Sequence, residues 1–259
     1  MEALTVILLI VVGLVFGSFL NVCIARLPHH ESIARPGSRC PLCGQAIAWY
    51  DNIPLLSFML LRGRCRTCGR AISWRYPAIE LANAALWLLC WLKYGLTLQG
   101  FGMAVLSFLL LGLAAMDAET LRLPNTFTLP GIVLGIVYSG AVCGRLRCAL
   151  MSAVWAIAAG TVLSAIAEAY WVLRKRHGMG MGDAKLIALV AAWLGPAEAI
   201  LVLFLGSVAA AIYGLGAGLA RRRLDGTAPL PFGSFLCGSA LYAAFNGHRI
   251  LAWYVSLFH

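Results

Sequence analysis

Two aspartates stand at the edges of long apolar segments, where they could carry out acid–base chemistry. Asp117 follows the apolar run at residues 99–116, and Asp183 opens another run in the sequence Gly180-Met181-Gly182-Asp183. Acidic side chains in or beside apolar spans are costly, so they mark functional sites by default. Two carboxylates that share a site hold one proton between them. The ionised one can take a proton from water while the protonated one polarises a peptide carbonyl, which is general acid–base hydrolysis.

The residues on either side of Asp183 fit a site for a peptide. Gly180 and Gly182 permit backbone conformations that are closed to other residues and let a peptide approach the main chain closely. Lys185 follows two positions after the aspartate. We therefore assign these two glycines and the lysine to a substrate-binding or active-site loop. A structural alternative stays open, in which both aspartates only cap helices or pair with Arg122 and Lys185.

Four cysteines could hold a metal ion. They form two CxxC pairs, Cys40 with Cys43 and Cys65 with Cys68, at a separation slightly longer than the usual zinc-ribbon spacing. Together they supply the tetrahedral set of four sulfurs that Zn2+ prefers, and the adjacent glycines Gly44 and Gly69 would let the chain turn tightly. Four thiolates leave no open position for water, so this zinc would be structural. The alternative is four cysteines that are free or disulfide-bonded.

Other polar side chains have weaker claims to chemistry. Glu80 could pair with Arg75 or with an arginine of the first loop. The remaining cysteines lie mostly in apolar runs, where a small buried side chain is the ordinary interpretation. Cys143 and Cys148 flank the predicted loop at residues 144–147 and could form a disulfide, although we do not predict one.

The elements that must position these residues are membrane helices. Hydrophobic residues make up 61% of the 259-residue chain and charged residues 12%, whereas an ordinary soluble domain is about 25% charged. A soluble protein with a single core is therefore excluded. The apolar runs predict an all-α polytopic membrane protein with about eight transmembrane helices, at residues 4–23, 78–92, 99–116, 127–142, 149–173, 184–194, 197–219 and 235–258.

Lys and Arg are distributed unevenly between the loops, and this predicts the orientation. The first loop and the alternate loops on its side carry sixteen of the twenty basic residues, among them Arg176 and residues 221–223. Cytoplasmic loops collect such an excess, so we expect the first loop in the cytoplasm and both termini outside. The net charge of +10 lies between apolar runs rather than over a soluble surface, so it does not indicate a nucleic-acid partner.

Taken together, these motifs resemble the type IV prepilin peptidases, also called prepilin leader peptidase/N-methyltransferases, of bacterial pilus and type II secretion systems. The resemblance covers most of the chain. Besides the aspartate and cysteine motifs, it rests on residues 17–22, 26–28, 51–54, 61–65, 72–77, 80, 117–125 and 231–233.

The resemblance implies a GxGD-type aspartic endopeptidase of the bacterial inner membrane, with Asp117 and Asp183 as the catalytic pair. Such an enzyme removes the short basic leader of prepilins or pseudopilins, ahead of their hydrophobic helix, at the cytoplasmic face. Its partners would be these substrates, the lipid bilayer and the pilus or type II secretion assembly machinery. Many members also methylate the new N-terminus with S-adenosylmethionine. That activity is implied by the resemblance alone, and no residue is assigned to the methyl donor.

On this basis the chain divides into a first transmembrane helix at residues 1–24, a cytoplasmic tetracysteine zinc loop domain at residues 25–76, and a membrane peptidase domain at residues 77–259 with about seven further helices. One departure from the family pattern is Ser234, where a proline commonly follows Pro-Phe-Gly.

Two other functional classes are compatible with parts of the sequence. A proton-coupled transporter could use the membrane carboxylates as a relay, although such proteins place them near the bilayer midplane and often contain inverted repeats. A non-enzymatic scaffold could dock a partner on the zinc loop, and its aspartates would then be structural.

Overall fold

The computed structural model describes residues 2–175, 180–220 and 230–257. The predicted cytoplasmic residues Arg176 and 221–223 lie outside this part of the chain. Within the described residues the protein is all-helical, as predicted, with two isolated β-bridges and no strand. The chain separates into two compact units, Met1–Gly112 and Leu113–His259, and the boundary falls within helix α4 (Leu98–Thr120).

The first unit is built on α1 (Glu2–Arg26) and α3 (Arg75–Tyr94), which pack along each other. Buried Asn83 donates its side-chain N–H to the Gly13 carbonyl at 2.7 Å, and Phe16 stacks on Trp87 with a centroid distance of 5.0 Å. The segment between these helices contains the short helices η1 (Leu27–His29), η2 (Trp49–Asn52) and α2 (Leu56–Leu60). Long apolar helices therefore flank a segment with little regular structure.

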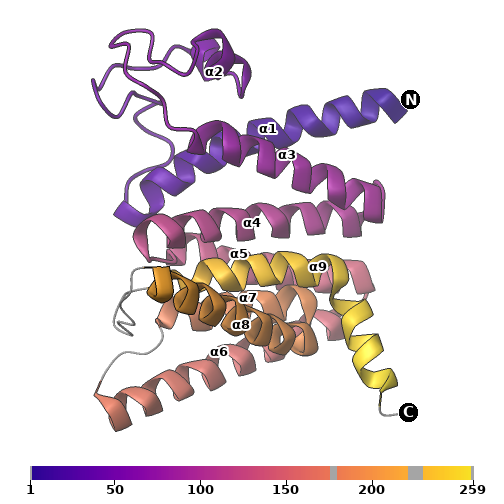
Figure 1. The fold of residues 1–259 in the computed structure, drawn as a ribbon. Coiled ribbons are helices and arrows are strands. Elements are labelled where there is room, and N and C mark those ends of the chain that lie inside the picture. The colour runs from indigo at the N-terminus through magenta and orange to yellow at the C-terminus, as the bar shows by residue number, and fades with distance from the viewer. Residues whose placement is uncertain (1, 176–179, 221–229, 258–259) are drawn as a thin grey trace. The chain divides into compact units, whose positions relative to one another are not determined.

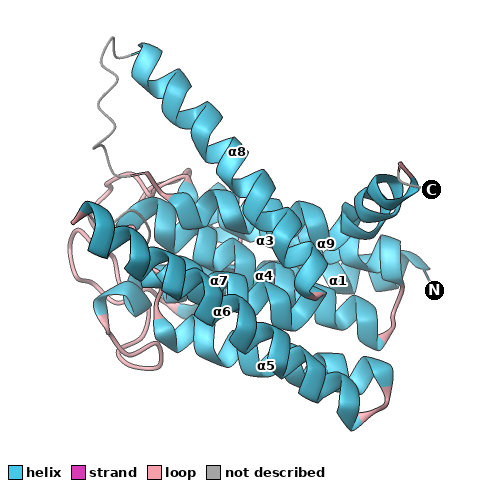
Figure 2. Cartoon of the chain, turned by 90° about the horizontal axis from the view of Figure 1, so that it is seen from below, coloured by secondary structure: helices cyan, strands magenta, loops and turns pink. Residues whose placement is uncertain are grey.

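The second unit surrounds one short helix, α7 (Met181–Leu194). It packs against α5 (Asn125–Cys143), α6 (Leu146–Arg174), α8 (Pro196–Ala220) and α9 (Phe232–Ser256); Figure 2 shows α5, α6 and α7 side by side. Ser152 donates to the Ala192 carbonyl at 2.8 Å, and Trp193 donates to the Gly131 carbonyl at 2.9 Å. Neighbouring helices thus hold α7 by hydrogen bonds as well as by apolar contact.

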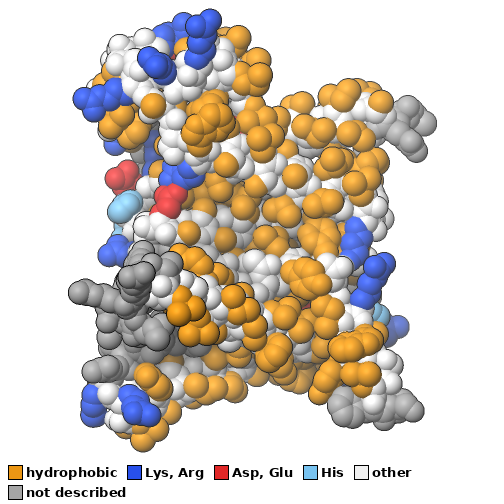
Figure 3. Space-filling model, viewed as in Figure 1, with side chains coloured by type: hydrophobic (Ala, Val, Ile, Leu, Met, Phe, Trp, Pro, Cys, Tyr) orange, Lys and Arg blue, Asp and Glu red, His pale blue; other side chains and the backbone are white. Residues whose placement is uncertain are grey.

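The structure supports a membrane protein but does not confirm the count of eight spans. Each of the eight predicted segments coincides with a helix of the described chain, although the one at residues 184–194 is the short helix α7 (Figure 1). Five of these are long and apolar enough to cross a membrane, namely α1, α4, α5, α6 and α8. On the face in Figure 3, hydrophobic side chains cover the helices and Lys and Arg gather near loops and helix ends. The three-part domain division stays a prediction.

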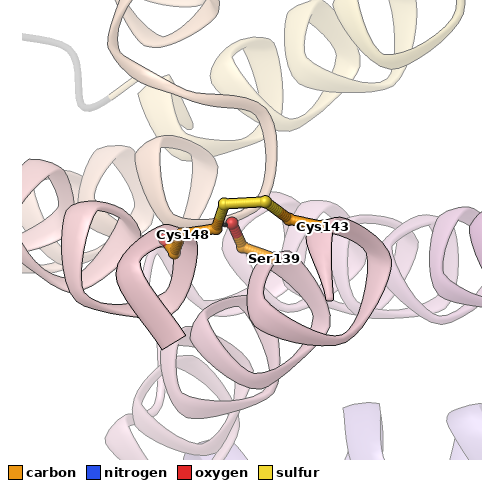
Figure 4. The surroundings of a disulfide bond; sticks show 3 residues. All are labelled: Ser139, Cys143 and Cys148. Carbon is orange, nitrogen blue, oxygen red and sulfur yellow. Dashed lines mark hydrogen bonds between the residues drawn. A yellow bond between two sulfur atoms is a disulfide. The ribbon is translucent and has the colours of Figure 1, made fainter. Parts of the chain in front are cut away.

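One covalent link in the second unit was not predicted. A disulfide joins Cys143, at the end of α5, to Cys148 in the first turn of α6. Figure 4 shows Ser139 beside this bond, and its hydroxyl donates to the Cys148 carbonyl at 3.4 Å. The tight turn between the two helices brings both cysteines to the same end of the helix pair, so here they are bonded rather than free.

Candidate active site and metal centre

Asp117 lies near the end of α4 and is held by the start of α9. Its side chain is 5% exposed. The backbone N–H of Ser234 donates to its Oδ2 at 2.7 Å, and the Ser234 hydroxyl lies 3.0 Å from the same oxygen and 2.9 Å from the Ala114 carbonyl. Ser234 belongs to the first turn of α9, where the helix dipole favours a negative charge, and its N–H is shared with the Pro231 carbonyl at 3.1 Å.

Asp183 stands at the start of α7 and is likewise held by a backbone N–H. It is 8% exposed and belongs to the first turn of the helix. The backbone N–H of Gly180 donates to its Oδ2 at 3.2 Å. The helix-capping part of the structural alternative therefore applies to Asp183. Because capping occupies one carboxylate oxygen, it is compatible with a chemical role for the group.

The fold brings the two aspartates together. They are close enough to interact electrostatically, and Cys237, one turn beyond Ser234 on α9, is fully buried near both of them. Leu123 packs between Gly182 of the α7 motif and Gly233 at the start of α9. A Cβ atom on Gly182 would lie 3.0 Å from Leu123 Cβ, and one on Gly233 would lie 3.0 Å from both Asp117 Cγ and Leu123 Cδ1. Three stretches that are distant in sequence therefore converge on one site.

Lys185, which we assigned to the active-site loop, binds Asn125 instead of an aspartate. Its Nζ donates to Asn125 Oδ1 at 2.7 Å. Asn125 begins α5, so this bond ties the first turns of α5 and α7 together beside Asp183. The lysine thus lies next to the site and donates to a neutral amide.

Ser234 is the residue of this site that sequence reasoning missed. We noted it only as a departure from the proline that commonly follows Pro-Phe-Gly. A proline has no backbone N–H, so it could not make the 2.7 Å bond to Asp117. The sequence did contain a signal for this role. At the start of an apolar helix it has a serine, which can donate hydrogen bonds from its N–H and its hydroxyl, where the family commonly has a proline.

The four predicted zinc ligands form one cluster. The sulfur atoms of Cys40, Cys43, Cys65 and Cys68 all lie within 4.8 Å of one another. The two pairs have matching backbone geometry. The Cys40 N–H donates to the Gln45 carbonyl at 2.9 Å, and the Cys40 carbonyl accepts from the Gly44 N–H at 2.9 Å. The Cys65 N–H likewise donates to the Arg70 carbonyl at 2.8 Å, and the Cys65 carbonyl accepts from the Gly69 N–H at 2.9 Å.

Backbone donors also favour thiolates in this cluster. The N–H groups of Cys43 and Leu42 lower the pKa of the Cys40 thiol to about 7. Those of Cys68 and Thr67 lower the pKa of Cys65. Metals bind the deprotonated sulfur, so the first cysteine of each turn is prepared for a cation by its own backbone. Desolvation and the neighbouring Cys40 and Cys68 instead raise the pKa of the Cys43 thiol to about 11.

Two polar contacts fix the segment that carries the cysteines. Arg66 makes a bidentate ion pair with Asp51, with both N···O distances 2.7 Å, and it holds the pKa of that carboxyl below its usual range. Glu80 of α3 accepts a hydrogen bond from the Leu55 N–H at 2.9 Å. Glu80, for which the sequence allowed an arginine partner, thus binds the backbone of the loop.

Known proteins match most of the chain. The model of the bacterial peptidase A24 N-terminal domain matches residues 11–94, and that of the type IV leader peptidase family matches residues 103–215. Three relatives named prepilin leader peptidase/N-methyltransferase come from Myxococcus xanthus, Klebsiella pneumoniae and Pseudomonas putida. The Myxococcus xanthus relative is 39% identical over 230 residues, which cover 87% of this chain and 68% of the relative. The Klebsiella pneumoniae relative is 42% identical over 200 residues, or 71% of this chain and 82% of the relative. The Pseudomonas putida relative is 34% identical over 276 residues, or 93% of this chain and 91% of the relative.

No solved structure matches the chain. The matched segments contain the four cysteines and both aspartates. With relatives above 30% identity over most of their length, the chain belongs to the type IV leader peptidase family.

Proposed function

We propose that this protein is a membrane aspartic endopeptidase that removes the leader from prepilins or pseudopilins, with Asp117 and Asp183 as its catalytic pair. The observation that carries the proposal is the convergence of two buried carboxylates, each held by a backbone N–H at the start of a helix. The names of the relatives give the substrate class.

The geometry suits hydrolysis without a covalent intermediate. The pair holds one proton. The ionised carboxylate takes a proton from water as the water oxygen bonds to the peptide carbon, and the protonated carboxyl donates to the carbonyl oxygen. The C–N bond then breaks and the leaving amine takes up a proton. Hydrogen bonds from Ser234 and Gly180 fix Oδ2 of the two carboxylates, which keeps both side chains in position during these transfers.

The loop before Asp183 is the proposed place for the scissile peptide. Gly180 and Gly182 lie on either side of Met181 at the start of α7, and Lys185 is fixed by Asn125 one turn later. Glycine has no side chain, so a substrate main chain can approach closely.

We also propose that the protein methylates the new N-terminus with S-adenosylmethionine. The names of the relatives support this activity. Within the described residues there is no strand followed by a glycine-rich loop, which is the pattern of many nucleotide sites. No residue is therefore assigned to the methyl donor.

The four-cysteine cluster is proposed to hold one structural Zn2+. A tetrahedral zinc with Zn–S bonds of about 2.3 Å places its sulfurs about 3.8 Å apart. The sulfurs of Cys40 and Cys68 are 4.0 Å apart, so the residues fit the ion. With four thiolate ligands no position is open for a reacting group, and the zinc would organise the loop rather than act on the substrate.

The proposed setting is the bacterial inner membrane, with the N-terminus outside and the zinc loop in the cytoplasm, where prepilins present their basic leaders. The orientation is supported by the excess of Lys and Arg in the first loop. The pilus or type II secretion assembly machinery would receive the processed substrate.

Mass spectrometry of a prepilin co-expressed with this chain tests the proposal. We expect the wild type to remove the leader and to add one methyl group. Asp117→Asn and Asp183→Asn should each leave the leader intact while the protein still accumulates in the membrane. Glu168→Gln is a matched control, because Glu168 is an exposed acid on α6, and it should process normally. Processing by either aspartate variant would exclude the catalytic pair and favour the scaffold alternative.

A further inference from the structure

A cavity of about 310 Å³ lies between α5, α6 and α7. Its walls are mostly apolar and include Ile132 and Ile136 of α5, Ile157 and Thr161 of α6, and Met181 and Lys185 of α7. The volume falls within the range of about 300 to 1,000 Å³ that is typical of ligand sites. The three helices pack on one another (Figure 2), so they form a continuous wall for this space.

The cavity borders the turn of α7 that carries Asp183, although Asp183 itself does not line it. Met181 and Ala184, which line it, flank Gly182 and Asp183 on the first turn of α7. Lys185 also lines it and is bonded to Asn125. A group seated in the cavity would therefore lie against the same turn of helix that carries one of the proposed catalytic carboxylates.

The cavity also opens to the outside of the helix bundle. Ile157 is 66% exposed although it lines the space. The Thr161 hydroxyl donates to the carbonyls of its own helix at Ile157 and Ala158, at 2.8 and 3.0 Å, so it is not held by another helix. An elongated partner could therefore reach this part of the wall from the side of the bundle.

The chemistry of the walls decides which part of a prepilin would bind here. A basic leader is disfavoured, because the cationic Lys185 lies in the wall and the remaining lining is largely apolar. An apolar helix in a membrane gains from close packing against such a surface, and small residues allow it to come near. Ala153, Ala156 and Ala188 line the same space.

We propose that this cavity binds the first turns of the hydrophobic helix that follows the scissile bond of the prepilin. The inference rests on the proposed leader-peptidase function. In this arrangement the cavity between α5, α6 and α7 fixes how far the substrate helix extends along the enzyme. The peptide bond just ahead of that helix then reaches Asp183 and Asp117.

Thr161→Phe fills the cavity, and Val162→Phe is its matched control. Val162 is the next residue of α6, is 59% exposed and does not line the cavity. The purified variants are compared on a full-length prepilin and on a peptide that spans the cleavage site but ends before the hydrophobic helix. We expect Thr161→Phe to lower kcat/KM for the full-length substrate by about tenfold or more, because binding energy from a remote part of the substrate is lost. The short peptide should be cleaved at the wild-type rate, and Val162→Phe should match the wild type on both substrates.

A crosslinking measurement covers the case in which Thr161→Phe fails to fold. A photoreactive benzoylphenylalanine at Ile157 should crosslink to the first turns of the prepilin helix, and the same group at Val162 should not. Equal crosslinking from both positions, capture of lipid alone, or unchanged cleavage by a folded Thr161→Phe variant would overturn the inference. In each of these outcomes the wild type still cleaves the prepilin, so only the inference about the cavity fails. If instead the wild type cleaves neither substrate, the proposed function itself is wrong.

Discussion

At the scale of single residues, the contact between Ser234 and Asp117 is the most informative of the site. Both the backbone N–H and the hydroxyl of Ser234 lie within hydrogen-bonding distance of one carboxylate oxygen. The hydroxyl has one hydrogen and two acceptors, Asp117 and the Ala114 carbonyl. It can donate to the carboxylate when that group is ionised and to the carbonyl otherwise. We infer that Ser234 is a positioning residue for Asp117.

Ser234→Ala removes the hydroxyl and keeps the backbone bond. A hydrogen bond to a charged group is worth about 1.5–3 kcal/mol, so we expect kcat for leader cleavage to fall by about tenfold or more with KM little changed. Steady-state kinetics on a purified prepilin measure this. Ser234→Thr should restore most of the loss. Ser239→Ala, a buried serine on the same helix, is the control, and an equal loss there would mean that Ser234 acts only through packing.

Residue types and local spacing predicted some members of the site and not others. Asp117, Asp183 and the four cysteines carry their chemistry in the side chain and stand in short motifs, so they could be named in advance. The partners of Asp117 could not, because they come from a helix that begins more than a hundred residues later. Lys185 was predicted as part of the loop, but its bond to Asn125 depends on how α5 and α7 pack.

At the scale of elements, the segment between α1 and α3 illustrates what a motif can specify. Two CxxC turns with matching backbone bonds gather four sulfurs in a stretch that has only short helices and isolated bridges. Gly44 and Gly69 adopt positive φ values of 71° and 68°, as their place in the turns required. Few apolar side chains are buried there, so a metal would contribute much of the segment's stability.

Replacing one ligand tests this dependence. Wild-type protein purified without chelator should contain about one zinc per chain, measured by elemental analysis. Cys65→Ser should lose most of it and become sensitive to limited proteolysis between residues 27 and 74, while cleavage of the leader changes much less. Cys90→Ser is the control, since Cys90 is buried on α3 beside Ser107 and outside the cluster. A wild type without zinc would refute the proposed metal.

The helices themselves were the easiest elements to predict, because long apolar runs that avoid charge have few other structures available in a membrane. The disulfide between Cys143 and Cys148 was not predicted. Cysteines in or next to apolar runs are usually buried thiols, and only the short turn between α5 and α6 places these two side by side.

At the scale of the whole molecule, composition decided the class of protein and charge decided the predicted orientation. The distribution of the basic residues between apolar runs does not indicate a binding surface for an acidic partner. Most of them lie on the predicted cytoplasmic side, where they favour anionic lipid head groups. The basic leader of the proposed substrate would gain nothing from this charge, so recognition must come from apolar contacts and from the two aspartates.

Thiol labelling in intact spheroplasts tests the orientation. In a Cys143→Ser variant the partner Cys148 is free, and the predicted outside position of the α5–α6 turn should let a membrane-impermeant maleimide modify it. The exposed Cys43 of the first loop should react only after the membrane is opened and zinc removed. Peptide mass spectrometry distinguishes the two sites. The reverse pattern would place the zinc loop outside.

The short length of α7 has a consequence for where the chemistry takes place. Fourteen residues of helix rise about 21 Å, whereas the hydrocarbon core of a bilayer is about 30 Å thick. Even if it stands upright, α7 cannot bring both of its ends to the two membrane surfaces. Irregular backbone at that depth is tolerated only where protein encloses it, and α5, α6, α8 and α9 provide that enclosure. The backbone groups at an end of α7 that lies within the hydrocarbon core must therefore find their hydrogen-bond partners inside the protein.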